Sequence, residues 1–331
     1  MARAWGPWTE VKLEALENYL AAFTTASARA KGTLYLDLFA GAPENEMRDG
    51  RRPLVASPER ALEVQPPFTK LIFCELQPRS ATSLRRSLGQ RFPGRDITVL
   101  AGDCNKTMPP ALASLAEGWR YAPTFAFLDQ FSAQVTWQTI EALARFKAPE
   151  KWKTELWLFF PDALIPRGAY QVEGQPRFEE FAHRVDLMYG TADWRVILRG
   201  RHAGVLTAPQ ARSELLNLMR WRLERTLGYK ATLPLTVTNG NGTPIYTMVH
   251  ATDHQAGISI MTSVLRAAGE RLEHMRAEAK IQRRAEREEE RGVLALFPED
   301  AAALVDRSKL NETFEPPRPP WGWMAAGDDL G

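Results

Sequence analysis

Acidic and small residues stand at the ends of several short apolar runs in this sequence. The first run delivers Asp37 and Gly41, the second Glu75, the third Asp103 and the fourth Asp129. If these runs are neighbouring parallel strands, their carboxyl ends meet at one edge of the sheet, which is where such sheets bind ligands. Carboxylates at that edge accept hydrogen bonds from hydroxyl or amino groups. The residues therefore predict a nucleotide-type binding site.

S-adenosylmethionine suits these residues better than a dinucleotide does. The turn after the first run lacks the later glycines of the G-x-G-x-x-G pattern and has Pro43 in place of one of them. S-adenosylmethionine has no pyrophosphate and tolerates a looser turn. We expect Gly41 to admit its methionine portion, Glu75 to accept its ribose hydroxyls and Asp103 to contact its adenine. The residues expected to bind this cofactor are Asp37, Phe39, Ala40, Gly41, Glu75, Asp103 and Cys104.

Each of these carboxylates also has a purely structural alternative. A single acid after a strand commonly caps the next helix or closes a turn, and for Glu75 or Asp103 alone that role is the commoner one. The agreement of four consecutive strand ends is what favours a ligand site.

The residues after the fourth run resemble a methyl-acceptor site. The segment 127–132 is similar to the catalytic loop of amino-methyltransferases, in which an acid accepts an amino hydrogen and an aromatic ring stacks on an extruded base. Asp129 would be the acceptor and Phe131 the stacking platform. That loop usually has Asp-Pro-Pro-Tyr, so Gln130 and Ser132 depart from it. The alternative for Asp129 is a helix-capping carboxylate.

Histidine and acidic residues near the end of the last strand raise the question of a metal. We expect none at His250, Asp253 and His254, because two histidines so spaced at a strand end do not share a face and no further ligands are evident. A metal-dependent nuclease using Asp37, Asp129 and Asp253 is the least favoured alternative, since the sequence has no compact carboxylate motif.

Basic residues interspersed with aromatic ones occupy the segment 195–230. Such side chains suit phosphate contact and base stacking, although a solvated helix face is the commoner explanation. Three arginines of the first long loop would join them if that loop folds over the same edge of the sheet. The candidate nucleic-acid contacts are Arg48, Arg51, Arg52, Arg220, Trp221 and Arg222.

Strands and helices must alternate to position these residues. Apolar runs too short for buried helices predict strands, and amphipathic patterns between them predict helices, so the sheet should be parallel with right-handed crossovers. The segment 233–252 predicts an antiparallel hairpin around an asparagine-glycine turn. The predicted strands are 34–41, 70–76, 96–103, 124–131 and 155–161. The fold class is therefore α/β, a doubly wound, mostly parallel, Rossmann-like sheet that ends in an antiparallel hairpin, with an extra C-terminal helix and tail. This arrangement resembles the class I methyltransferase fold.

Three parts are expected along the chain. Residues 1–32 form an N-terminal helix packed on the core, with Thr9 as a plausible N-cap, and Ser57 should cap a later helix. Residues 33–265 form the Rossmann-like domain, including a helical insertion at about 167–230. Residues 266–331 form a long charged helix and a tail rich in proline and tryptophan, which should be poorly ordered unless it docks.

Composition limits the class of protein. The chain has 331 residues, a net charge of +2 and two cysteines. A disulfide framework is excluded, no apolar run approaches a membrane span, and no signal-peptide core is evident near the N-terminus. These features favour a cytoplasmic protein without membrane contact.

Several stretches together resemble the three-Cys-motif partner family, named for its occurrence beside a radical-SAM-like protein with three cysteines. The resemblance rests on the opening helix, the strand with Asp37 and Gly41, and the stretches around Glu75, Asp103 and Asp129. It also includes Trp137 and the closing segment 244–257. The resemblance implies a methyltransferase-like fold and a radical-SAM-like partner. This chain departs from the family pattern after the first strand and at Gln130.

Two functions of different classes follow from these features. The first is methyl transfer from S-adenosylmethionine to a nucleic-acid base, with Asp129 and Phe131 presenting the acceptor nitrogen. The second is a non-catalytic binding partner that uses the cofactor cleft, or the C-terminal helix and tail, to dock another protein. The departures in both loops favour the second function.

Overall fold

The computed structural model describes residues 4–5, 7–42, 46–47, 55–148, 152–162, 174–239, 243–290 and 314–322. Their centre is a seven-stranded sheet in the order β5-β4-β2-β6-β7-β9-β8. The strands are β2 (Leu34–Asp37), β4 (Lys70–Glu75), β5 (Asp96–Ala101), β6 (Thr124–Leu128), β7 (Glu155–Phe160), β8 (Ala231–Thr238) and β9 (Pro244–Thr252). A separate pair, β1 (Ala4–Trp5) and β3 (Glu46–Met47), is parallel.

The first five strands of the sheet are parallel, and β9 runs antiparallel to both β7 and β8. Numbered along the chain, these seven strands have the order 3-2-1-4-5-7-6. This is the doubly wound arrangement of class I methyltransferases with its reversed seventh strand. The predicted fold class, including the antiparallel hairpin, is confirmed.

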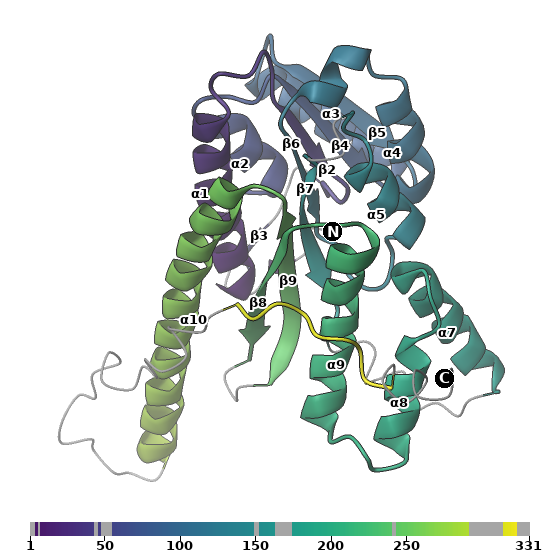
Figure 1. Ribbon diagram of the computed structural model, residues 1–331. Helices are drawn as coiled ribbons and strands as arrows, with labels where there is room; N and C mark the ends of the chain where they lie inside the picture. Colours follow the sequence, from purple (N-terminus) through teal and green to yellow (C-terminus); the bar gives the residue numbers. More distant parts are fainter. Residues whose placement is uncertain are drawn as a thin grey trace, which may run out of the picture.

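Helices cover both faces of the sheet (Figure 1). α1, α2, α3 and α10 pack on one face, while α4 and α5 pack on the other, where α7, α8 and α9 extend the same apolar core. The helices are α1 (Pro7–Ala26), α2 (Ser57–Glu63), α3 (Pro78–Arg91), α4 (Cys104–Ala113), α5 (Trp137–Ala144), α7 (Pro176–Tyr189), α8 (Trp194–His202), α9 (Ala208–Trp221) and α10 (Gln255–Glu290). A 3₁₀ helix (Glu117–Tyr121) precedes β6, and a π-helical turn (Arg222–Thr226) follows α9.

Alternation along β2 decides which side chains reach which face. Leu34 and Leu36 join the core beneath α4 and α5, whereas Tyr35 joins the core beneath α1 and α2. Asp37 is two residues after Tyr35, so its side chain points to the same face of the sheet. Its carboxylate accepts a hydrogen bond from Ser57 of α2. The strand pattern therefore sends the first acid of the predicted site toward α1 and α2.

Two predicted N-caps are wrong. α1 begins at Pro7, so Thr9 lies inside its first turn. α2 has Ala56 at its N-cap without a side-chain hydrogen bond, because the hydroxyl of Ser57 donates to Asp37 instead. A long-range partner thus replaces the local capping interaction.

The insertion and the tail form one packed unit. α8 was not predicted, and Trp194 and Ile197 bury it against the core. Residues 314–322 run across α9 toward α8 (Figure 1), and Trp321 packs on Gly200, where a Cβ would stand 2.4 Å from the indole. This part of the tail docks on the protein.

The predicted long C-terminal helix is present. α10 is continuous from Gln255 to Glu290, so the boundary expected after residue 265 falls within it. Its first half contacts α1, β8 and β9. No helix within the described ranges is both long and apolar enough to cross a membrane.

Candidate functional site

The carboxyl ends of four parallel strands bring the predicted acids to one edge of the sheet. β2 pairs with both β4 and β6, and β5 pairs with β4 in a register that places Glu75 beside Ala101. Asp37 ends β2, Glu75 ends β4, Asp103 follows β5 and Asp129 follows β6. The four carboxylates therefore lie at the carboxyl ends of adjacent parallel strands, as the strand pattern predicts.

Asp37 organises the entrance to the first loop. Its side chain is fully buried, with Oδ1 accepting the backbone N–H of Phe39 at 3.0 Å and Oδ2 accepting the hydroxyl of Ser57 at 2.6 Å. Burial raises the pKa of Asp37 to about 7, although both hydrogen bonds oppose the rise. This aspartate shapes the loop and is too enclosed to contact a ligand directly.

The raised pKa of Asp37 predicts a pH-dependent stability. The unfolded chain releases this proton near pH 4 and the folded protein only near pH 7, so the folded state loses stability as pH rises through that interval. Asp37→Asn has no such proton, and it should gain stability relative to the native protein by on the order of 3–4 kcal/mol between pH 4 and pH 8. Urea unfolding across this pH range measures the difference. The half-exposed Asp96→Asn is the control, and equal pH dependence of native protein and Asp37→Asn would contradict the prediction.

The loop after β2 turns sharply above β4. The N–H of Ala40 donates to the carbonyl of Cys74 at 2.9 Å, and Gly41 has a φ of +76°. No described atom lies within 4 Å of the position that a Cβ would take on Gly41. A left-handed glycine beside open space lets a ligand approach the backbone closely.

Glu75 and its neighbour offer a polar and an apolar surface side by side. Oε1 of Glu75 accepts the backbone N–H of Gln77 at 2.8 Å, which fixes the carboxylate at the end of β4. Leu76, the next residue, is 54% exposed although it is apolar. An exposed apolar side chain beside a fixed carboxylate can pack against a flat ring whose attached hydroxyls reach the acid.

Asp103 caps the helix that follows β5. Its Oδ1 accepts the backbone N–H of Asn105 at 2.9 Å and the Asn105 side-chain amide at 3.0 Å, so the structural role considered for Asp103 is present. One carboxylate oxygen is used in this cap, and a carboxylate has capacity for further donors. Cys104 is buried, and burial raises the pKa of its thiol to about 12, which keeps it protonated.

Asp129 is paired with a lysine from the N-terminal helix. Nζ of Lys12 lies 2.5 Å from Oδ2 of Asp129, and Lys12 is only 4% exposed. Oδ1 of Asp129 receives no hydrogen bond from the described residues. The pair thus fixes one oxygen of the carboxylate and leaves the other at the partly open edge of the sheet.

The loop after Asp129 is rigid in spite of its unusual sequence. Gln130 is 1% exposed, and its side-chain oxygen accepts the backbone N–H groups of Gln134 and Val135 at 2.9 and 2.8 Å. Its amide donates to the carbonyl of Phe159. Phe131, in contrast, is 76% exposed. Gln130 therefore holds the loop so that the Phe131 ring stands out beside Asp129.

Three residues at this edge were not predicted. Lys12 could have been found from the sequence, because it is a charged residue in the helical stripe of Trp8 and Leu16, where an apolar residue is expected. Leu76 could have been found because it directly follows Glu75. Asp162 follows β7 as the other acids follow their strands; it is 3% exposed, accepts the Thr247 hydroxyl at 2.5 Å, and burial raises its pKa to about 6.

The predicted basic contacts lie away from this edge or have partners within the protein. Arg220 donates to the hydroxyl and carbonyl of Thr232 and to the carbonyl of Glu315, while Arg222 lies 4.3 Å above the ring of Trp137. The guanidinium of Arg225 lies 5.2 Å from the Trp221 ring. Burial lowers the pKa of both Arg220 and Arg222. Arg48, Arg51 and Arg52 lie outside the described residues.

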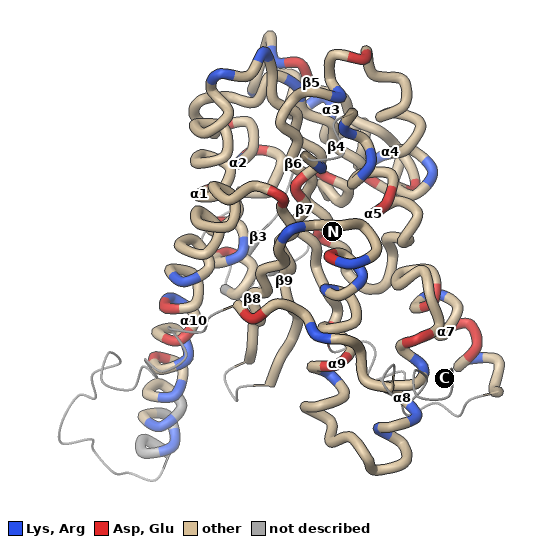
Figure 2. Tube along the Cα trace, viewed as in Figure 1, with Lys and Arg blue, Asp and Glu red and all other residues tan. Residues whose placement is uncertain are grey.

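Figure 2 shows basic and acidic residues mixed along α7 and α10. The Arg195 guanidinium, for example, lies 2.6 Å from the carboxylate of Asp186. Within the basic segment 195–230 itself, Arg195 and Arg220 have partners inside the protein.

The acids proposed for nuclease chemistry do not converge. Asp253 follows β9 at the amino end of β7, where it accepts hydrogen bonds from Lys153 and Lys230. Asp37 and Asp129 lie at the opposite edge of the sheet. His250 is buried beside Glu155, and His254 stacks on Trp152. Within the described part of the chain, no three histidine, cysteine or acidic residues gather as metal ligands.

Comparison with known proteins assigns no family to the chain. No family model matches the chain, and no curated protein has a significantly similar sequence. Protein LPL1258 from Legionella pneumophila is similar in structure, with 12% identity, 77% of this chain and 90% of that chain covered, and a TM-score of 0.44.

Two further solved structures are also similar, one with SAH bound and one with AdoMet bound. The plantazolicin methyltransferase BpumL in complex with SAH has 8% identity, covers 74% of this chain and 84% of its own, and has a TM-score of 0.37. TYW2 from M. jannaschii in complex with AdoMet has 10% identity and a TM-score of 0.33, and the similarity covers 71% of this chain and 75% of the TYW2 chain. These similarities concern the methyltransferase-like fold of distant sequences, and they transfer neither ligand nor substrate to this chain.

Proposed function

We propose that this protein binds S-adenosylmethionine at the edge formed by β2, β4 and β5 and transfers its methyl group to an amino group of a nucleic-acid base. The observation that supports this most is the placement of Gly41, Glu75, Asp103 and Asp129 at adjacent strand ends within a methyltransferase-like sheet. The edge is where open α/β sheets bind ligands.

The residues present fit an adenosine-bearing cofactor. The open space beside Gly41 admits the methionine portion against the backbone. Glu75 would accept the two ribose hydroxyls, and Leu76 would pack on the adenine ring. Asp103 would accept a hydrogen bond from the adenine amino group with the carboxylate oxygen that its helix cap does not use.

The acceptor side consists of Asp129, Lys12 and Phe131. S-adenosylmethionine, when bound, supplies a methyl group already activated by the sulfonium charge, so the protein's contribution is mostly positioning. Oδ1 of Asp129 would accept one amino hydrogen of the base, while Lys12 holds Oδ2. Phe131 would carry the extruded base on its exposed ring.

Calorimetric titration with S-adenosylmethionine tests the cofactor site. Glu75→Ala should weaken binding at least tenfold, because each charge-assisted hydrogen bond that it removes contributes about 1.5–3 kcal/mol. Glu117→Ala, which removes an exposed acid at the opposite edge of the sheet, should leave the affinity unchanged. No binding by the native protein, or equal binding by Glu75→Ala, would exclude this site.

The acceptor site needs a separate assay. Transfer of a labelled methyl group to single-stranded DNA or RNA should fall at least tenfold in Phe131→Ala with cofactor affinity unchanged, because stacking contributes about 1–3 kcal/mol per base. Transfer to added protein but to neither nucleic acid would exclude the base as acceptor.

The Lys12 pairing also favours a second function. An acceptor carboxylate already neutralised by an internal cation is what a non-catalytic relative could retain for structure alone. In that case the chain would be a binding partner of the radical-SAM-like protein that the sequence resemblance implies. Co-purification of the two proteins, without cofactor binding by this chain, would support the second function over the first.

A further inference from the structure

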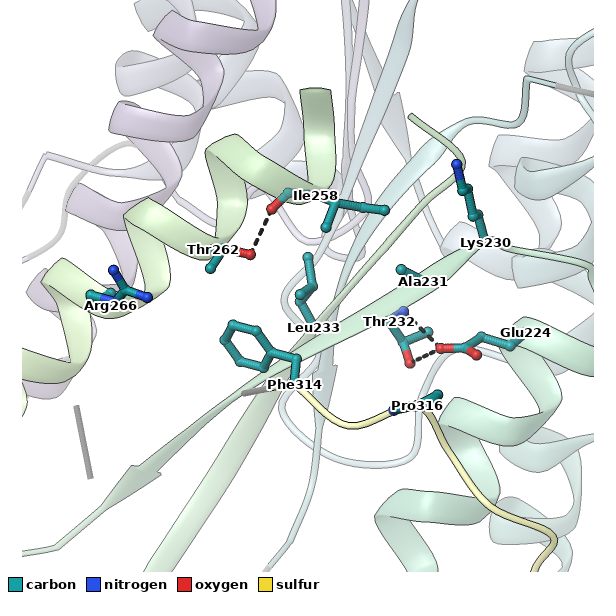
Figure 3. A pocket seen from close by; sticks show the side chains of 10 residues that line it. All are labelled: Glu224, Lys230, Ala231, Thr232, Leu233, Ile258, Thr262, Arg266, Phe314 and Pro316. Atoms are coloured by element: carbon teal, nitrogen blue, oxygen red, sulfur yellow. Dashed lines mark hydrogen bonds between the residues drawn. The ribbon is translucent and has the colours of Figure 1, made fainter. Parts of the chain in front are cut away.

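A pocket of about 310 Å³ lies at the other end of the strands from the candidate methyltransfer site (Figure 3). It is bounded by the first half of β8, the first turns of α10, the π-helical turn and the docked tail. The lining residues include Leu233, Ile258, Thr262, Phe314 and Pro316. Its volume is at the small end of the range for ligand pockets.

The walls of the pocket are mainly apolar. Leu233 is 3% exposed and forms part of the core, and Ile258 packs against the same core from α10. Phe314 closes the pocket from the tail and also contacts that core. An apolar body of a ligand would be removed from water between these side chains.

Two cations stand on opposite sides of the pocket. Figure 3 shows Lys230 at the β8 side and Arg266 at the α10 side. Neither side-chain cation has a hydrogen bond or an ion pair with the described residues. Glu224, the acid in the lining, accepts the backbone N–H and the hydroxyl of Thr232 at 2.8 and 2.6 Å. With two cations and one acid in its lining, the pocket carries a net positive charge.

The strand edge beside the pocket is closed to a peptide. β8 is the last strand of the sheet, and an exposed edge strand can pair with an added strand. Here the N–H of Thr232 donates to Glu224 and its carbonyl accepts from Arg220. Pro234 has no N–H to offer. Pairing of an added strand is therefore blocked here, so the pocket suits a small molecule better than an extended chain.

The wall formed by the tail is held in place from outside the pocket. The side chain of Asn217 bonds both backbone groups of Arg318, at 2.9 and 3.1 Å. The guanidinium of Arg220 donates to the carbonyl of Glu315 at 2.5 Å. A ligand that contacts Phe314 and Pro316 would thus stabilise the docked tail as well.

The geometry points to a binding site for a small amphipathic anion, with its apolar body between Leu233, Ile258 and Phe314 and its anionic group beside Lys230 or Arg266. The site does not depend on the proposed methyltransferase function, because it lies at the opposite edge of the sheet.

Decanoate, decylamine and decanol, titrated calorimetrically into the full chain, test the proposal. These probes share a ten-carbon chain and differ in charge. Decanoate should bind at least tenfold more tightly than the other two. The double variant Lys230→Met and Arg266→Met should lose that preference, whereas Arg86→Met, an exposed arginine of α3, should keep it.

Hydrogen exchange locates the binding. Decanoate should slow amide exchange in residues 314–322, and Phe314→Ala should weaken decanoate binding severalfold with unchanged secondary structure. The proposal is overturned if decanoate does not bind, if it binds no better than decylamine, or if the double variant binds it as the native protein does.

Discussion

Lys12→Met is expected to lower the free energy of unfolding by about 2–4 kcal/mol, because it leaves the Asp129 carboxylate partly buried without its counter-charge. The ammonium group lies 2.5 Å from Asp129 and 5.5 Å from the centre of the Tyr246 ring. Methionine fills a similar volume, so the loss measures charge rather than packing. Urea unfolding at pH 8 gives the value.

Two comparisons separate this effect from general damage. The double variant Lys12→Met with Asp129→Asn should recover most of the loss, since it removes both charges. Arg145→Met breaks the exposed pair with Glu141 and should cost no more than about 1 kcal/mol. A double variant that is as unstable as Lys12→Met alone would contradict the ion-pair explanation.

Glu155→Leu is expected to cost about 3–5 kcal/mol, because it removes the one carboxylate that satisfies three buried polar groups. Glu155 accepts hydrogen bonds from Tyr19 of α1 and from the Thr252 hydroxyl at 2.9 Å, and it lies 3.3 Å from Nε2 of His250. All four side chains are buried, and Gly257 of α10 lies directly against them. The cluster joins α1, β7, β9 and α10.

The protonation of Glu155 fixes the pH range of this prediction. Burial alone would raise the pKa of Glu155. The hydrogen bond and charge of His250, together with the hydrogen bonds from Tyr19 and Thr252, outweigh this effect, so the pKa is lowered. The stabilisation is present above about pH 4.5 and is lost as pH falls through the folded-state pKa. Glu155→Gln, which keeps one acceptor, should cost less than Glu155→Leu. Thermal unfolding near pH 7 compares them, and equal costs would refute the network.

The fold was predictable because its signals are local. Each buried parallel strand is a short apolar run, and each connecting helix has an amphipathic pattern, so a parallel sheet with helical crossovers followed from their alternation. α8 was missed because its nine residues include three arginines and Gly200, while its burial comes from Trp194 and Ile197 packing in the core and from Trp321 packing on Gly200. Such a contact between residues distant in sequence leaves no periodic signal.

The candidate site was predictable only in part, for the same reason. Strand ends identified Asp37, Glu75, Asp103 and Asp129, because their positions follow from the topology. The partners of these acids could not be predicted from the strand pattern. Lys12, the partner of Asp129, and Ser57, the partner of Asp37, lie on helices whose orientation is set by the tertiary structure. Arg220 is of a residue type that commonly contacts nucleic acid, yet its guanidinium donates hydrogen bonds to Thr232 of β8 and to Glu315 of the tail.

Co-crystallisation with S-adenosylhomocysteine tests the central proposal most directly. We expect the adenosine between Leu76 and Asp103, its ribose hydroxyls on Glu75, and its amino-acid portion against Gly41. A saturated complex with the ligand elsewhere, or no bound ligand at millimolar concentration, would contradict a cofactor site at the carboxyl ends of β2, β4 and β5.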